Sequence, residues 1–165
     1  MKSLLCDAVI IIDAHNLGIW KLLKSHYRIH FASTILKKEA QYFKDDLQLK
    51  YYLDFRKDIA SGRIIKISMP IEEIQTVIKK ACENRLDIQA GEAESIAALL
   101  KPEYQQLYFC TADKAAITAT HLYDVMSQVV SFEKCLKGVK SCKLPYKLTE
   151  KAMQRWKAEA IQRIG

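Results

Sequence analysis

Acidic side chains stand at several points where the sequence predicts the end of a strand or the start of a helix. Asp13 follows an apolar run at residues 8–12, and Asp113 follows another at residues 107–110. Glu94 opens a short apolar helical segment, and Glu39 lies late in another one. Carboxylate oxygens are the ligands that Mg²⁺ and Mn²⁺ prefer, and such a cation beside a phosphate promotes phosphodiester hydrolysis.

Four carboxylates brought to one place would repel one another. Two like charges about 5 Å apart repel by roughly 3 kcal/mol at an effective dielectric constant near 20, and a divalent cation would supply the counter-charge. Each acid taken alone has a simpler explanation, because an Asp or Glu at a helix start commonly caps the helix or meets its dipole. Glu92 and Glu94 show the ambiguity, since residues two apart on a helix point in nearly opposite directions.

The elements that would position these acids follow from the hydrophobic pattern. The β-branched run at residues 8–12 predicts a central buried strand, and a helix is expected directly after Asp13. Ser33 or Thr34 is expected to cap the helix that carries Glu39, and the mixed spacing over residues 45–60 favours a helix. Pro70 and the acids after it predict another helix start. Further strands are expected at residues 27–31, 64–67, 107–110 and 129–132, and a final helix after Thr149.

Strands that alternate with helices along the whole chain predict an α/β fold. We expect a three-layer α/β/α sandwich around a central, mainly parallel sheet. In such folds ligands bind at the carboxyl ends of the strands, which is where the acids are predicted to lie. The length of 165 residues fits one domain, at residues 1–142, with residues 143–165 as a helical extension packed on it.

Composition and charge narrow the class of protein. The net charge of +7 permits a polyanionic partner such as nucleic acid. No apolar segment approaches the roughly 20 residues that span a bilayer, and Asp7 interrupts the first apolar stretch, so neither a membrane protein nor a signal peptide is expected. The five cysteines are odd in number and lack CxxC spacing, and Cys82 and Cys110 are expected to be buried. These features predict a cytoplasmic protein with reduced thiols.

Four short motifs together resemble the PIN-domain family, metal-dependent ribonucleases that include the VapC-like toxins. VIIIDAHNL is similar to the family's opening strand and acid, here Asp13, and STILKKEA to its second motif, here Glu39. GEAESIAAL is similar to the third motif in its GEAEA form, with Glu94 as the acid. FCTADKAA is similar to the fourth, with Thr111 and Asp113. The resemblance covers residues 8–133 and departs from the family pattern after Asp13 and just before Asp113.

The resemblance implies a metal-dependent endoribonuclease that hydrolyses RNA with Mg²⁺ or Mn²⁺ and is in some relatives the toxin of a toxin–antitoxin pair. It implies that Asp13, Glu94 and Asp113 bind the metal, with Glu92 as an auxiliary ligand or a helix cap. Glu39 would complete the catalytic set, and Thr111 would orient a carboxylate or the attacking water. An antitoxin partner and a homodimer are left open.

Two other classes of function compete with this one. A catalytically silent PIN-like module would hold RNA or a protein without cutting it, although a scaffold has no reason to keep a repulsive cluster of acids. A nucleotide-binding α/β domain is disfavoured because a Gly-rich phosphate loop is missing. Surface residues are ambiguous: His15, Lys114 and the lysines Lys21, Lys24, Lys37 and Lys38 could meet phosphate, and Tyr42, Phe43, Tyr51 and Tyr52 could stack on bases, or all could have structural roles.

Overall fold

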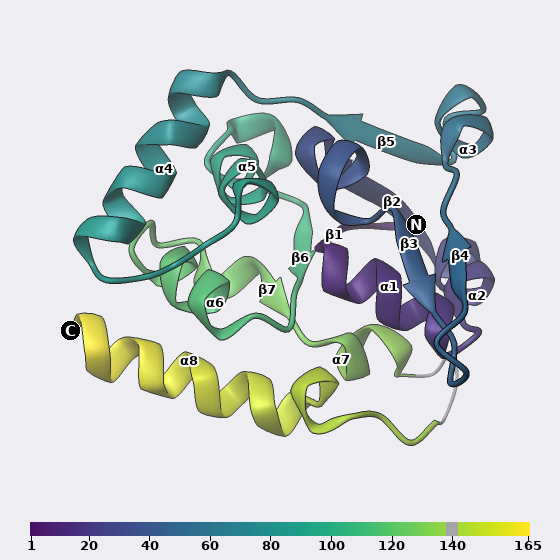
Figure 1. The fold of residues 1–165 in the computed structure, drawn as a ribbon. Helices are drawn as coiled ribbons and strands as arrows, with labels where there is room; N and C mark the ends of the chain where they lie inside the picture. Colours follow the sequence, from purple (N-terminus) through teal and green to yellow (C-terminus); the bar gives the residue numbers. More distant parts are fainter. Residues whose placement is uncertain (138–141) are drawn as a thin grey trace.

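A five-stranded parallel sheet forms the centre of the computed structural model, which describes residues 1–137 and 142–165 (Figure 1). Its order is β5-β2-β1-β6-β7, so β1 is central, as expected for the first strand. Every pairing within it is parallel. The strands are β1 (Lys2–Cys6), β2 (Tyr27–Ala32), β5 (Ile64–Ile67), β6 (Tyr108–Cys110) and β7 (Val129–Val130).

Helices cover both faces of this sheet, which confirms the predicted α/β/α sandwich. Leu4 and Cys6 of β1 point to one face, against α1 (Ala8–Asn16), α2 (Trp20–His26) and α7 (Phe132–Leu136). Leu5 points to the other face, against α5 (Ala90–Leu99) and α6 (Lys114–His121). Outside these, α4 (Ile71–Glu83) packs on α5, and α8 (Glu150–Ile164) packs on α6. Period-two alternation along β1 therefore builds two separate cores.

The first strand lies earlier in the chain than predicted. Residues 8–12 were expected to form it, but they belong to α1, and β1 ends just before Asp7. The Asp7 carboxylate accepts a hydrogen bond from the Ala8 amide at 2.7 Å and caps α1. Ile10, Ile11 and Ala14 then recur at helical spacing on the buried side. A short buried apolar run fits either a strand or a helix, and the capping acid decides for helix.

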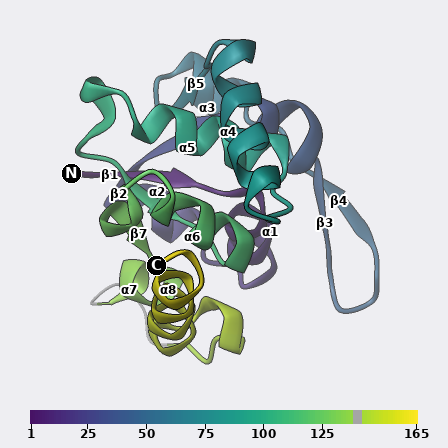
Figure 2. The ribbon, with the colours of Figure 1, turned by 90° about the vertical axis from the view of Figure 1, so that its left-hand side faces the viewer.

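The helix expected over residues 45–60 is replaced mainly by a β-hairpin. Strands β3 (Tyr42–Lys44) and β4 (Lys50–Tyr52) pair antiparallel and form a separate two-stranded sheet. Figure 2 shows this hairpin extending away from the rest of the molecule. Only α3 (Arg56–Ala60) is helical, and it stops before Gly62 as predicted. Aromatic residues favour paired strands over helix, which explains the difference.

Most other predictions agree with the structure. The strands after β1 lie close to their predicted positions, but β7 is shorter because Ser131 caps α7 by accepting a hydrogen bond from the Lys134 amide at 3.0 Å. Thr149 caps α8 as expected. The short helical segments are η1 (Ile35–Glu39, a π-helical turn), η2 (Pro102–Tyr104), η3 (Met126–Gln128) and η4 (Tyr146–Leu148).

The structure bears on the predictions about the cysteines and about membrane-spanning segments. All five cysteines are free; Cys110 is buried as predicted, whereas Cys82 is exposed, because it lies on the outer side of α4. Among the residues that the structure describes, no helix is long and apolar enough to cross a membrane.

Candidate functional site

Two acids close the adjacent strands β1 and β6 at their carboxyl ends. Asp7 follows β1 directly and caps α1, while Asp113 follows β6 and caps α6 by accepting a hydrogen bond from the Ala116 amide at 2.9 Å. Thr111 connects them: its hydroxyl donates to Asp7 Oδ2 at 2.8 Å and accepts from the Asp113 amide at 3.1 Å. The parallel pairing of β1 with β6 thus brings residues about a hundred positions apart to one edge of the sheet.

Glu39 and Glu92 reach the same edge from η1 and α5. The Gly91 amide donates a hydrogen bond to Glu39 Oε1 at 2.9 Å, while Glu39 Oε2 is buried and has no hydrogen-bond partner. A Cβ atom on Gly91 would lie 2.4 Å from that oxygen, so only glycine admits Glu39 here. Glu92, one residue on, is buried and accepts a hydrogen bond from the Gln89 amide at 2.8 Å in a capping box.

These four carboxylates lie near enough to influence one another's ionisation and are called here the acidic cluster (Asp7, Glu39, Glu92 and Asp113). Burial raises the pKa of Asp7 to about 6, with further raising by Glu39 and Asp113 against the hydrogen bonds from Thr111 and Ala8. Burial likewise raises the pKa of Glu92 to about 8, reinforced by Asp7, Asp113 and Glu39. Within the described part of the chain, none of the four forms an ion pair with a lysine or arginine.

Glu94, predicted as a metal ligand, is committed to a different network. Its carboxylate is buried and accepts three hydrogen bonds, from the Ser33 hydroxyl at 2.8 Å, the Thr34 amide at 2.8 Å and the Met69 amide at 3.0 Å. These donors follow β2 and β5, so Glu94 ties the ends of two strands to α5. It is not among the groups that raise the pKa of Asp7 or Glu92.

Asp13 also lies apart from the acidic cluster. It sits in the second half of α1 and forms an ion pair with Lys147 at 2.8 Å. The acid at the end of the central strand is Asp7 and not the predicted Asp13. A signal for it existed, because Asp7 ends the apolar run of residues 4–6 and precedes apolar residues at helical spacing.

Two surface residues considered as phosphate contacts have structural roles. His15 hydrogen-bonds through Nδ1 to the Ile11 carbonyl at 2.7 Å and stacks on Trp20 with ring centroids 4.9 Å apart. Lys114 forms an ion pair with Glu159 of α8.

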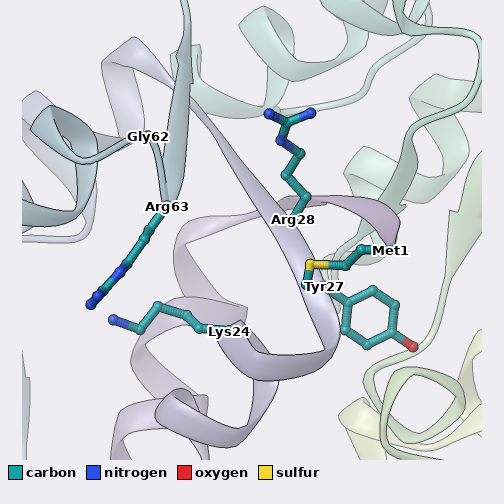
Figure 3. A pocket seen from close by; sticks show the side chains of 6 residues that line it. All are labelled: Met1, Lys24, Tyr27, Arg28, Gly62 and Arg63. Atoms are coloured by element: carbon teal, nitrogen blue, oxygen red, sulfur yellow. The ribbon is translucent and has the colours of Figure 1, made fainter.

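The opposite edge of the sheet is basic. A hollow of about 430 Å³ lies at the amino ends of β1, β2 and β5 (Figure 3), lined by Met1, Lys24, Tyr27, Arg28, Gly62 and Arg63. Asp58 is the acid there, 2.6 Å from Lys24 and 4.0 Å from Arg63. These cations face away from the carboxyl edge, so they do not neutralise the acidic cluster.

The carboxylates as placed do not form a finished cation site. Across the described residues, no group of three or more His, Cys, Asp or Glu side chains is arranged to hold a metal ion. Several of their oxygens are occupied by helix caps and by Thr111, which turns them toward the protein backbone. The residue types, the buried unpartnered oxygen of Glu39 and the raised pKa values of Asp7 and Glu92 nevertheless fit a divalent cation, which would replace protons as the counter-charge.

Comparison with known proteins adds no relative: no family model, no curated protein and no solved structure matches the chain.

Proposed function

We propose that the protein is a metal-dependent endoribonuclease of the PIN type, with the acidic cluster as its active site. The observation that carries the proposal is that four carboxylates from separate elements meet at the carboxyl edge of a parallel sheet without a basic partner among the described residues. Such an arrangement is unfavourable for a scaffold, and a divalent cation would supply the missing counter-charge. In this proposal Asp7 would have the role that the resemblance gave to Asp13, and Glu92 would have that of Glu94.

The chain's own residues have distinct parts in this proposal. Asp7, Glu92 and Asp113 would hold Mg²⁺ or Mn²⁺, and Glu39 would complete the set through the oxygen that now has no partner. The Thr111 hydroxyl fixes the orientation of Asp7, and Gly91 leaves the space that Glu39 occupies. When bound, the cation would supply positive charge against the phosphate and make the attacking water easier to deprotonate.

Cleavage of RNA tests the proposal. Purified protein is incubated with mixed-sequence RNA and Mn²⁺, with and without EDTA, beside the Asp7→Asn and Asp113→Asn variants. We expect cleavage that EDTA stops and that each substitution lowers by about 100-fold or more, the effect of losing several kcal/mol of charge stabilisation. Asp13→Asn serves as the matched control and should cleave like the parent protein. Metal-independent cleavage, or equal loss in the Asp13 control, would overturn the assignment.

The alternative is a PIN-like module that binds RNA or a protein without cutting it. The observation in its favour is that the carboxylates, as placed, form no ready cation site among the described residues. Titration calorimetry with Mn²⁺ separates the two: a proton-releasing binding event that Asp7→Asn removes favours the nuclease, and no binding favours the module. If the nuclease is a toxin, the proposal also includes an antitoxin protein that binds it and a cytoplasmic location.

A further inference from the structure

The β3–β4 hairpin has two faces of different character. Antiparallel pairing sets Tyr42 opposite Tyr52 and Lys44 opposite Lys50, and alternation puts these four side chains on one side, called here the outer hairpin face. Phe43 lies on the other side, where it stacks on Tyr51 with centroids 5.1 Å apart. The inner side has a structural role, because Phe43 also stacks on His15 of α1, with centroids 5.5 Å apart.

The outer hairpin face is aromatic, basic and open to solvent. Tyr52 is 77% exposed and Tyr42 37% exposed, with ring centroids 6.0 Å apart. The Lys50 ammonium lies 4.6 Å from the centroid of the Tyr42 ring. Over the described chain, neither Lys44 nor Lys50 forms an ion pair with an acid. Exposed rings flanked by lysines without an acidic partner suit a single strand of nucleic acid, with bases on the rings and phosphates on the ammonium groups, and Lys50 would then leave the Tyr42 ring for a phosphate.

Of the two acids in the hairpin turn, Asp46 is exposed, whereas Asp45 builds the turn. Its carboxylate accepts hydrogen bonds from the amides of Leu47 at 3.0 Å and Leu49 at 2.9 Å, and from the Tyr51 hydroxyl at 2.9 Å. Tyr51 belongs to the inner side, so Asp45 is turned away from the outer hairpin face.

The hairpin is connected to the elements of the acidic cluster along the chain and through a contact with α1. It begins three residues after Glu39, and the exposed Lys37 and Lys38 lie just before that acid. Phe43 rests on His15, which is separated from Asp7 by about 12 Å along α1 at the helical rise of about 1.5 Å per residue. The outer hairpin face, the exposed Lys37 and Lys38, and Glu39 therefore belong to one short stretch of chain, residues 37–52.

We propose that the outer hairpin face binds single-stranded RNA and delivers it to the acidic cluster, with Tyr42 and Tyr52 as stacking platforms and Lys44 and Lys50 as phosphate contacts. Single strands are specified because paired bases are not free to stack on protein rings. The inference rests on the proposed function for its choice of RNA as the polyanion.

Binding measured without cleavage tests this inference separately from the nuclease proposal. A fluorescently labelled single-stranded RNA of about ten nucleotides is titrated in EDTA and followed by anisotropy. Tyr42→Ala/Tyr52→Ala should weaken binding about 10-fold or more, whereas Tyr42→Phe/Tyr52→Phe should bind within about twofold of the parent protein, because the rings remain. Tyr146→Ala removes an exposed tyrosine on η4 and should have no effect.

The lysines are tested through the salt dependence. Lys44→Gln/Lys50→Gln should reduce the slope of log affinity against log salt by about 1.4, since each single-strand phosphate contact contributes about 0.7. Thermal unfolding of every variant verifies that the fold is retained.

Three results would overturn the inference: no affinity of the parent protein for the RNA, equal affinity of the double-alanine variant, or self-association that this variant abolishes. The last would assign the hairpin to a protein contact, with Leu47 and Leu49 exposed at its tip. Hairpin-dependent binding without Mn²⁺-dependent cleavage would leave this inference standing and sink the nuclease proposal. Cleavage with hairpin-independent binding would do the reverse.

Discussion

Glu92 and Glu94 lie two positions apart on α5, both buried, yet their surroundings differ completely. Glu94 meets three hydrogen-bond donors from the ends of β2 and β5, so its negative charge is compensated by the fold. Glu92 meets one backbone donor and three other acids, so its charge is only partly compensated and the carboxylate holds its proton more tightly. The comparison teaches that burial of a carboxylate stabilises or destabilises according to the donors around it.

The largest expected difference between the two environments is a dependence of stability on pH. The pKa values of Asp7 and Glu92 are raised, so the folded state holds these protons more tightly than the unfolded chain. Their stabilising contribution is complete below about pH 4 and is lost as the pH rises through about 6 and then 8. We expect several kcal/mol of lost stability at about 1.4 kcal/mol per pKa unit, measured by urea unfolding in EDTA between pH 4 and 9.

Substitutions and added Mn²⁺ test whether Asp7 and Glu92 cause this pH dependence. Asp7→Asn and Glu92→Gln should each flatten the pH profile, and Asp13→Asn should leave it unchanged. Mn²⁺ should restore stability more at pH 8 than at pH 5, because it competes with protons for the same carboxylates. A flat profile in the parent protein would contradict the view that Asp7 and Glu92 are uncompensated.

The next largest expected effect is the difference between Glu92→Gln and Glu94→Gln in the rate of RNA cleavage. Under the proposed function, Glu92→Gln should lower the Mn²⁺-dependent rate by about 100-fold or more, since it removes a carboxylate from the acidic cluster. Glu94→Gln, compared per folded molecule, should cleave within a few-fold of the parent protein. The opposite result would mean that Glu94, not Glu92, faces the phosphate, as the sequence resemblance first suggested.

For the free energy of unfolding we expect the reverse order: Glu94→Gln should have the harmful effect and Glu92→Gln should not. Glu94→Gln places an amide NH₂ where the Ser33, Thr34 and Met69 donors converge, and we expect a loss of about 2 kcal/mol in the free energy of unfolding. Glu92→Gln should raise the stability above pH 8, because it removes repulsion. Chemical denaturation at pH 8.5 compares them directly, and equal losses would break the distinction.

The smallest expected effect concerns Gly91, which leaves the space that the Glu39 side chain occupies. Gly91→Ala would bring Cβ to 2.4 Å from Glu39 Oε2 and 2.5 Å from the Ile35 side chain, so Glu39 must move away. The gain of about 1 kcal/mol in helix propensity offsets part of the strain, and we expect a net loss of about 1 kcal/mol. In a Glu39→Ala background the same substitution should cost less; an equal cost would show that Ile35 alone resists the new atom.

The sequence predicted the layers better than the exact residues at the site. The strands of residues 27–31 and 64–67, the start of α4 and the cap of α8 all follow from local signals, and each is confirmed. Two apolar runs at the N-terminus are each followed by an aspartate; the longer one predicts a strand, but the shorter one forms it. The helix predicted over residues 45–60 gives way to a hairpin, because cross-strand partners that are several residues apart in the sequence stabilise paired strands.

By itself the sequence determined an alternating α/β chain with an excess of acids at the carboxyl ends of its strands, because periodicity and helix caps are local properties. Local patterns in the sequence also predicted three candidate site residues, Thr111, Asp113 and Glu39. Only the tertiary structure decided that Asp7 joins them, that Glu92 rather than Glu94 does so, and that Asp13 does not. Convergence depends on β1 lying between β2 and β6 and on where α5 begins, and those non-local contacts are not written in any short stretch of residues.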